Sequence, residues 1–272
     1  MLDLKRVNAY MDKVSKSEIE TFKTKKAIYK TGVDLGTAYI VLVVLDENDN
    51  PVACEKQAAE VLRDGVVVDY SGALNIVREL RAKLNARLDT ELINCAIAMP
   101  AGTESSARTH KYVAEGAGFD VTEILDEPSA ANAVYHIDNG VVVDIGGGTT
   151  GLAVIKDGVV TDIYDEPTGG THISLVLAGN YHISFAEAEK IKMDYKRHKE
   201  IFPVVRPVIE KMATIVARHI DPESIDTIYL CGGTCCLTGM ETVFEKVTGI
   251  KTVKPKDPFL VTPAGIAINC KL

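Results

Sequence analysis

A short pattern that occurs twice constrains the fold of this chain more than any other feature. In residues 141–155, three valines lead into Asp144, then three glycines, two threonines and a second apolar run. Residues 32–46 repeat this order around Asp34, with Gly-Thr in the turn. Either turn alone is equally well explained as a tight hairpin without a ligand. The repetition favours two related halves, each with one strand–turn–strand hairpin.

The residue types in these turns are suited to phosphate. Glycine lets the backbone approach a ligand closely, and successive N–H groups in such a turn point at an anion. Asp34 and Asp144 follow apolar strands, where a carboxylate can hold a hydrated divalent cation, and Thr149 or Thr150 can bind a phosphate oxygen. Both turns lead into a strand, whereas dinucleotide-binding and Walker loops lead into a helix. We therefore expect two hairpins that hold one polyphosphate.

The hydrophobic pattern predicts an α/β fold in which each half is a mixed sheet with helices on both faces. We divide the chain into residues 1–26, a helical extension; 27–138, a first domain with a short insertion near 55–92; and 139–272, a second domain. The predicted strands are 28–33, 40–45, 52–57, 93–99, 121–125, 141–145, 150–155, 159–164 and 225–230, with short strands near 66–68 and 253. The predicted helices are 73–88, 105–117, one from 127, 172–177, 185–198, 204–219, 241–247 and 262–270.

The first residues have helical spacing of apolar side chains. Leu4, Val7, Met11 and Val14 would lie on one face of a helix. Such a helix either packs on the body of the protein or docks on a partner.

Composition excludes several classes of function. A net charge of −8 is opposite to the basic surface that nucleic-acid binding requires. No apolar run is long enough to span a membrane. The six cysteines match neither a disulfide framework nor zinc spacing, so we expect a reducing, cytoplasmic environment.

Five motifs in order resemble those of the actin/Hsp70/sugar-kinase superfamily, and the nearest resemblance is to the ethanolamine-utilization chaperone-like family of bacterial microcompartment operons. The resemblance implies an actin-like, ribonuclease H-like ATPase fold with a nucleotide cleft between the halves. It also implies ATP and Mg²⁺ as ligands, a protein partner in an ethanolamine-catabolising assembly, and association with a microcompartment. The motifs are the first phosphate motif 34–37, the first connector 98–108 with 126–131, the second phosphate motif 144–149, the adenosine motif 230–234 and the second connector 262–267.

The resemblance assigns roles residue by residue. Asp34 and Asp144 would hold Mg²⁺ through water, and Glu127 would position the attacking water; the alternative for Glu127 is an ordinary acid in the first turn of a helix. Glu189 and Lys192 would contact the nucleoside, or form a surface ion pair instead. The phosphates would contact Gly36, Thr37, Gly146, Gly147, Gly148 and Thr149, and the ribose and adenine would contact Gly232, Gly233 and Thr234.

One departure limits the expected activity. No residue in 55–92 matches the lysine that assists phosphoryl transfer in Hsp70 proteins, so we expect slow or negligible ATP hydrolysis. The favoured function is an ATP-binding, chaperone-like accessory protein that controls a partner through its nucleotide state. The alternatives are an actin-like scaffold or filament, a reactivating factor for a cobalamin enzyme, and a small-molecule kinase.

Overall fold

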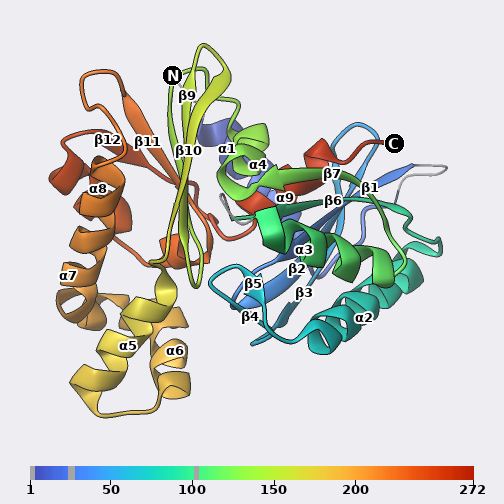
Figure 1. Ribbon diagram of the computed structural model, residues 1–272, viewed down its shortest axis with the longest axis horizontal. Helices are drawn as coiled ribbons and strands as arrows, with labels where there is room; N and C mark the ends of the chain where they lie inside the picture. The colour runs from blue at the N-terminus through green and yellow to red at the C-terminus, as the bar shows by residue number, and fades with distance from the viewer. Residues whose placement is uncertain (1–3, 24–27, 101–103) are drawn as a thin grey trace.

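The computed structural model describes residues 4–23, 28–100 and 104–272, in which two five-stranded sheets lie side by side (Figure 1). The first sheet has the order β3-β2-β1-β6-β7, with β1, β2 and β3 antiparallel and β1, β6 and β7 parallel. Ala101 of the predicted connector and residues 1–3 and 24–26 of the predicted extension lie outside the described residues. The strands are β1 (Tyr29–Leu35), β2 (Tyr39–Asp46), β3 (Pro51–Ala58), β6 (Asn94–Met99) and β7 (Asp120–Asp126).

The second sheet repeats this topology. Its order is β10-β9-β8-β11-β12, again three antiparallel strands followed by parallel neighbours. The equivalent arrangement confirms the predicted fold class of duplicated mixed sheets. The strands are β8 (Gly140–Ile145), β9 (Thr150–Lys156), β10 (Val159–Glu166), β11 (Thr227–Cys231) and β12 (Lys251–Val253).

Between β3 and β6, the chain forms a small hairpin and a long helix. The hairpin consists of β4 (Leu62–Arg63) and β5 (Val66–Val67), where a short strand or turn was predicted. The helix α2 (Tyr70–Leu88) begins after Asp69, whose side chain accepts a hydrogen bond from the Gly72 amide at 2.9 Å. Such a cap satisfies one of the free N–H groups at a helix start.

Other helices cover the sheets. They are α3 (Glu104–Gly116), α4 (Glu127–Tyr135), α5 (Gly170–Tyr181), α6 (Phe185–Met193), α7 (His198–Ala217), α8 (Met240–Thr248) and α9 (Val261–Asn269), with 3₁₀ turns η1 (Tyr195–Arg197) and η2 (Gly233–Cys236).

The boundary between α6 and α7 differs from the prediction. A helix was predicted through His198, but α6 ends at Met193 because Asp194 has an extended backbone (φ −81°, ψ 100°). The Asp194 side chain then accepts a hydrogen bond from the Lys196 amide at 3.0 Å and starts η1. Short polar side chains favour such local bonds over continuing a helix.

The helix α7 also starts earlier than predicted, at His198 rather than Val204, and contains Pro203 and Pro207. A proline inside a helix costs about 3 kcal/mol, and Pro203 directly precedes the predicted start at Val204. Burial of Ile201 and Val205 in the second core compensates for this cost.

The helices α4 and α9 cross at the centre of the molecule. A Cβ on Gly265 of α9 would lie 2.0 Å from the Ala130 carbonyl oxygen of α4, so only glycine permits this approach. Although α9 comes late in the chain, it packs on β1 and β2, whereas α4 packs on β8 and β9. Each helix thus packs on strands that lie on the other side of the predicted domain boundary at 138–139. That boundary remains a prediction.

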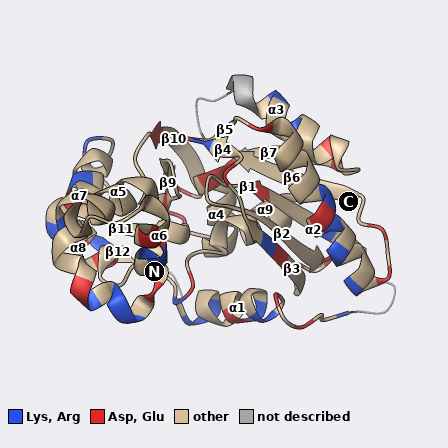
Figure 2. Cartoon of the chain, turned by 90° about the horizontal axis from the view of Figure 1, so that it is seen from below, with Lys and Arg blue, Asp and Glu red and all other residues tan. Residues whose placement is uncertain are grey.

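The N-terminal helix α1 (Leu4–Lys16) packs on the body, the first of the two predicted arrangements. Val7, Met11 and Val14 are buried against residues of both sheets and of α4 and α9. In Figure 2, α1 lies along one edge of the molecule, with a sheet on either side of its centre.

Candidate functional site

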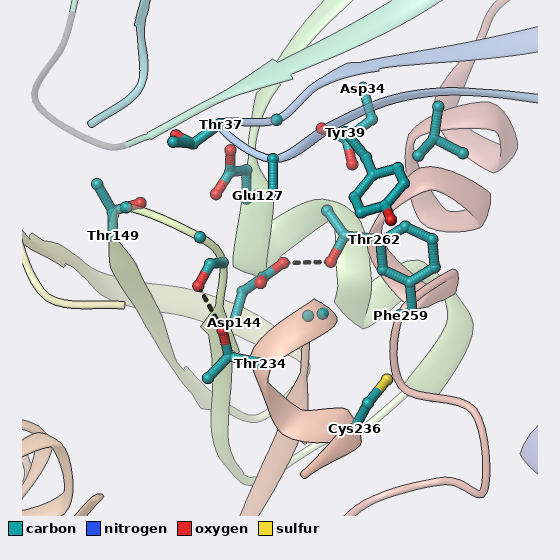
Figure 3. Close-up of a pocket in the computed structure, with 18 of the residues that line it drawn as sticks. Asp34, Thr37, Tyr39, Glu127, Asp144, Thr149, Thr234, Cys236, Phe259 and Thr262 are labelled. Carbon is teal, nitrogen blue, oxygen red and sulfur yellow. Dashed lines mark hydrogen bonds between the residues drawn. The ribbon is translucent and has the colours of Figure 1, made fainter. Parts of the chain in front are cut away.

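A cavity of about 370 Å³ lies between the two sheets (Figure 3). Its walls come from both halves, and every site residue that the family resemblance assigned lines it. These residues are Asp34, Gly36, Thr37, Glu127, Asp144, Gly146, Gly147, Gly148, Thr149, Glu189, Lys192, Gly232, Gly233 and Thr234. Thr150, named as the alternative to Thr149, does not line the cavity; its buried hydroxyl donates to the Thr168 carbonyl at 2.6 Å.

The two predicted hairpins have the same local geometry. In the first, the Gly36 amide donates to the Tyr39 carbonyl at 3.0 Å; in the second, the Gly146 amide donates to the Thr149 carbonyl at 3.0 Å. The tips face each other, because a Cβ on Gly147 would lie 3.3 Å from the Ala38 side chain. The repeat seen in the sequence is therefore a pair of opposed turns at one end of the cavity.

Three carboxyl groups approach these turns. Asp34 and Asp144 are each the residue before the last of their strands, β1 and β8, and Glu127 begins α4. Burial, and then the charge of Asp144, raise the pKa of Asp34 to about 7. Burial raises the pKa of Asp144 to about 6, although a hydrogen bond from Thr262 opposes this shift. Burial and the two aspartates raise the pKa of Glu127 as well.

The carboxyl groups do not enclose a metal ion by themselves. Among the described residues, no three His, Cys, Asp or Glu side chains are grouped closely enough to do so. Mg²⁺ commonly keeps several waters and takes further oxygens from a phosphate. The two aspartates fit such a water-mediated cation, since oxygen is the ligand that it prefers and a nearby cation would favour the ionised carboxylates that burial disfavours.

The predicted adenosine motif packs directly on the second phosphate motif. Gly232 has φ +89°, and a Cβ there would lie 2.2 Å from Asp144 Oδ1, so glycine is required by both conformation and space. The Thr234 hydroxyl donates to the Gly146 carbonyl at 2.7 Å. The adenosine motif and the second phosphate hairpin therefore form one continuous wall.

The Glu189–Lys192 ion pair is present, but it lies in the cavity wall and not on an open surface. Lys192 Nζ lies 2.6 Å from Glu189 Oε1 and donates to the Gly170 carbonyl at 3.1 Å. Their side chains are 26% and 14% exposed, respectively. Burial lowers the pKa of Lys192, and the Glu189 carboxylate opposes the shift. The ion pair predicted as the alternative is therefore present, but in the cavity wall, and contact with a nucleoside stays a prediction.

Sequence reasoning missed the aromatic part of the cavity. The rings of Tyr39 and Phe259, from opposite halves, meet edge to face with centroids 5.5 Å apart. Lys56 Nζ lies 5.1 Å from the Phe259 ring centroid. Tyr39 could have been suspected because it follows the Gly-Thr turn, but Phe259 lies in a loop with no periodic signal.

Two further aspartates near the phosphate hairpins were also missed. Asp64, at the tip of the β4–β5 hairpin, lies against Gly148. Burial raises the pKa of Asp165 to about 7, although a hydrogen bond with Thr149 opposes the shift. Asp64 lies between two short strands, and Asp165 lies near the end of β10, whose pairing is irregular, so no apolar run marked them.

Comparison with known proteins gives one family and one fold. A profile described as type IV pilus assembly protein PilM matches residues 110–262. The ethanolamine utilization protein EutJ of Salmonella typhimurium is 45% identical over 239 residues, which cover 87% of this chain and 84% of that protein. The crystal structure of EutJ from Carboxydothermus hydrogenoformans superimposes with a TM-score of 0.91 at 48% identity, covering 98% of this chain and 99% of that one.

A more distant structure shares the fold alone. MreB 5 of Spiroplasma citri bound to AMPPNP gives a TM-score of 0.71 at 19% identity, covering 89% of this chain and 95% of that one. These similarities confirm the predicted actin-like ATPase fold and the predicted family resemblance. No described helix has the length and apolar character needed to cross a membrane.

Proposed function

The chain belongs to the family of the ethanolamine utilization protein EutJ, and from this membership we propose that it binds Mg²⁺–ATP between its sheets and controls a protein partner through its nucleotide state. The observation that carries the proposal is the pair of opposed hairpins, with matching amide-to-carbonyl bonds at Gly36 and Gly146. Each hairpin is accompanied by one aspartate, Asp34 or Asp144.

The proposed site divides the nucleotide between two regions. Phosphates would be bound by the amides and hydroxyls of the two hairpins, including Thr37 and Thr149, and the nucleoside would lie along Gly232–Thr234 and the Glu189–Lys192 pair. Bound Mg²⁺ supplies positive charge to the phosphate oxygens. Asp34 and Asp144 would orient its waters.

The same geometry supports slow hydrolysis. Among the described residues lining the cavity, the lysines are Lys56 and Lys192, and each is paired with a glutamate. A cation at the transferring phosphoryl group is a major source of catalysis in related chemistry. Burial, and then the charges of Asp144 and Asp34, raise the pKa of Glu127, which disfavours the ionised form that acts as a base. The site therefore suits a nucleotide-dependent switch better than a fast ATPase.

Thermal unfolding tests the proposal. Mg²⁺–ATP should raise the Tm of the full chain, since a ligand at a hundred times its Kd stabilises the native state by about 2.7 kcal/mol. Asp144→Asn should remove this shift, whereas Asp162→Asn, on an exposed position of β10, should retain it. A wild-type chain whose Tm does not respond to Mg²⁺–ATP would contradict nucleotide binding.

A nucleotide-controlled scaffold is the second candidate. It is supported by the PilM profile over residues 110–262 and by the fold shared with MreB 5. Sedimentation with and without Mg²⁺–ATP separates the two candidates, because a filament pellets with nucleotide and a partner-binding switch stays in the supernatant. Association with a microcompartment follows from the family in the same way and is testable by co-purification with the shell.

A further inference from the structure

We propose that residues 4–22, which lie outside both sheets, form a clasp that positions cavity-lining residues of both halves. Glu18 of the clasp holds Lys56 of the first half, and Ser15 holds Asp257 of the second. The inference rests on the proposed nucleotide site. It assigns a role to residues that contact the walls of that site but not the nucleotide itself.

The clasp is densely attached to the first half. The Cys54 amide donates to the Ser17 carbonyl at 3.0 Å, and the Phe22 amide donates to the Val52 carbonyl at 2.9 Å, so the segment lies along β3. Arg87 of α2 fastens it further, with bonds to the carbonyls of Ser17 (2.7 Å), Glu18 (3.4 Å) and Glu20 (2.7 Å) and to the Thr21 hydroxyl (3.1 Å).

Fewer polar contacts join the clasp to the second half. The Lys256 amide donates to Asn8 Oδ1 at 2.8 Å, and the Ser15 hydroxyl donates to the Asp257 carboxylate. Between the two halves, Arg6 donates to the last carbonyls of α4, those of Val134 and Tyr135, at 3.0 and 2.9 Å. A cation is favoured at this end of a helix.

The middle of the clasp rests on the junction of the two sheets. Val7, Met11 and Val14 belong to one buried cluster that includes Val43 of β2 and Val142 of β8. The helix α1 therefore packs on both halves, and in Figure 2 it lies at the edge of the molecule between the two sheets.

The two residues to which Glu18 and Ser15 bind, Lys56 and Asp257, both lie at the cavity. Lys56 lines it from the first half, and Asp257 lines it from the second half. Lys56 Nζ lies 2.7 Å from Glu18 and faces the Phe259 ring. Asp257 is two residues before Phe259 and accepts its amide hydrogen bond at 3.3 Å, while the Pro258 carbonyl accepts from the Gly232 amide at 3.0 Å. Movement at Asp257 is thus transmitted to the nucleoside wall.

Because the clasp is attached more densely to the first half, its contacts with the second half should break first. A nucleotide enters and leaves a cleft between two halves when the halves move apart. The clasp should then stay on β3 and α2 and separate from Lys256 and Asp257, to which Asn8 and Ser15 are hydrogen-bonded. Removing those two bonds should make opening easier, and nucleotide release faster.

Stopped-flow release of a fluorescent ATP analogue from the full chain with Mg²⁺ tests the clasp. We expect Asn8→Ala with Ser15→Ala to release the analogue about tenfold faster, equivalent to about 1.4 kcal/mol. Asp12→Ala, on the exposed face of α1, is the matched control and should leave the release rate unchanged. Asn8→Ala with Ser15→Thr keeps a hydroxyl at position 15, so its release rate should lie between those of the wild type and the double alanine variant. By reciprocity, Mg²⁺–ATP should slow hydrogen exchange in residues 5–16.

The outcomes separate the two proposals. If the wild-type chain binds the analogue but the double variant, with an unchanged Tm, releases it at the wild-type rate, the clasp is wrong and nucleotide binding stands. If the wild-type chain binds no analogue, nucleotide binding fails, and the role of the clasp fails with it.

Discussion

Replacing Asp34 by asparagine should stabilise the nucleotide-free protein at pH 8. Burial, and then the charge of Asp144, raise the pKa of Asp34 from 3.8 to about 7, so the native state holds its ionised form at a cost. Since one pKa unit corresponds to about 1.4 kcal/mol, the shift amounts to roughly 4 kcal/mol. The asparagine amide must also be buried, so we expect a net gain of about 2–3 kcal/mol in the free energy of unfolding.

The direction of this effect with pH follows from proton binding. The unfolded chain releases the Asp34 proton near pH 3.8, whereas the native state keeps it up to about pH 7. Between these values the native state binds more protons, so the contribution of Asp34 to stability falls as pH rises. The advantage of the variant should therefore be small near pH 4, grow up to about pH 7 and remain constant above it.

Urea unfolding followed by circular dichroism, at pH 5 and pH 8, measures the effect. The exposed Asp162→Asn should change the free energy of unfolding by less than about 0.5 kcal/mol at either pH. The reasoning is refuted if Asp34→Asn is less stable than the wild type at pH 8, or if the two proteins lose stability in parallel between the two pH values.

Two other substitutions probe the site. Gly232→Ala should lower the free energy of unfolding by at least about 2 kcal/mol, because a Cβ would lie 2.2 Å from Asp144 Oδ1 at φ +89°. The control is Gly179→Ala, which should stabilise α5 slightly, since nothing lies within 4 Å of a Cβ there. Equal melting curves for the two variants would contradict the steric argument. Glu127→Gln should slow any phosphate release while the Tm shift with Mg²⁺–ATP persists, and unchanged turnover would remove Glu127 from the reaction.

The site was predictable because its residues occur in short contiguous motifs. Asp34 and Asp144 each follow a buried strand and precede glycines, so local sequence placed both at hairpin turns. Their repetition indicated two related halves, and the order of the elements then predicted two mixed sheets. The contacts between the halves followed from that symmetry.

Other parts of the fold depend on contacts that no local pattern encodes. The early start of α7 requires burial of Ile201 and Val205, which outweighs two prolines. The attachment of the N-terminal segment depends on hydrogen bonds from Arg87 of α2. In the sequence, Arg87 is indistinguishable from any other charged residue on the polar face of an amphipathic helix. Phe259 reaches the cavity only because the loop before α9 is held by Gly232.

The crossing of α4 and α9 also sets the order in which the protein can fold during synthesis. The strands of the first sheet are complete once Asp126 has been made, but β1 and β2 are covered by α9. That helix leaves the ribosome only after Val261–Asn269 has been translated. Until then, the apolar side chains of β2 that share a core cluster with α9 lack this helix, and exposed apolar surface of this kind promotes aggregation of nascent chains. A truncated product lacking α9 should therefore be a substrate for the cell's own chaperones.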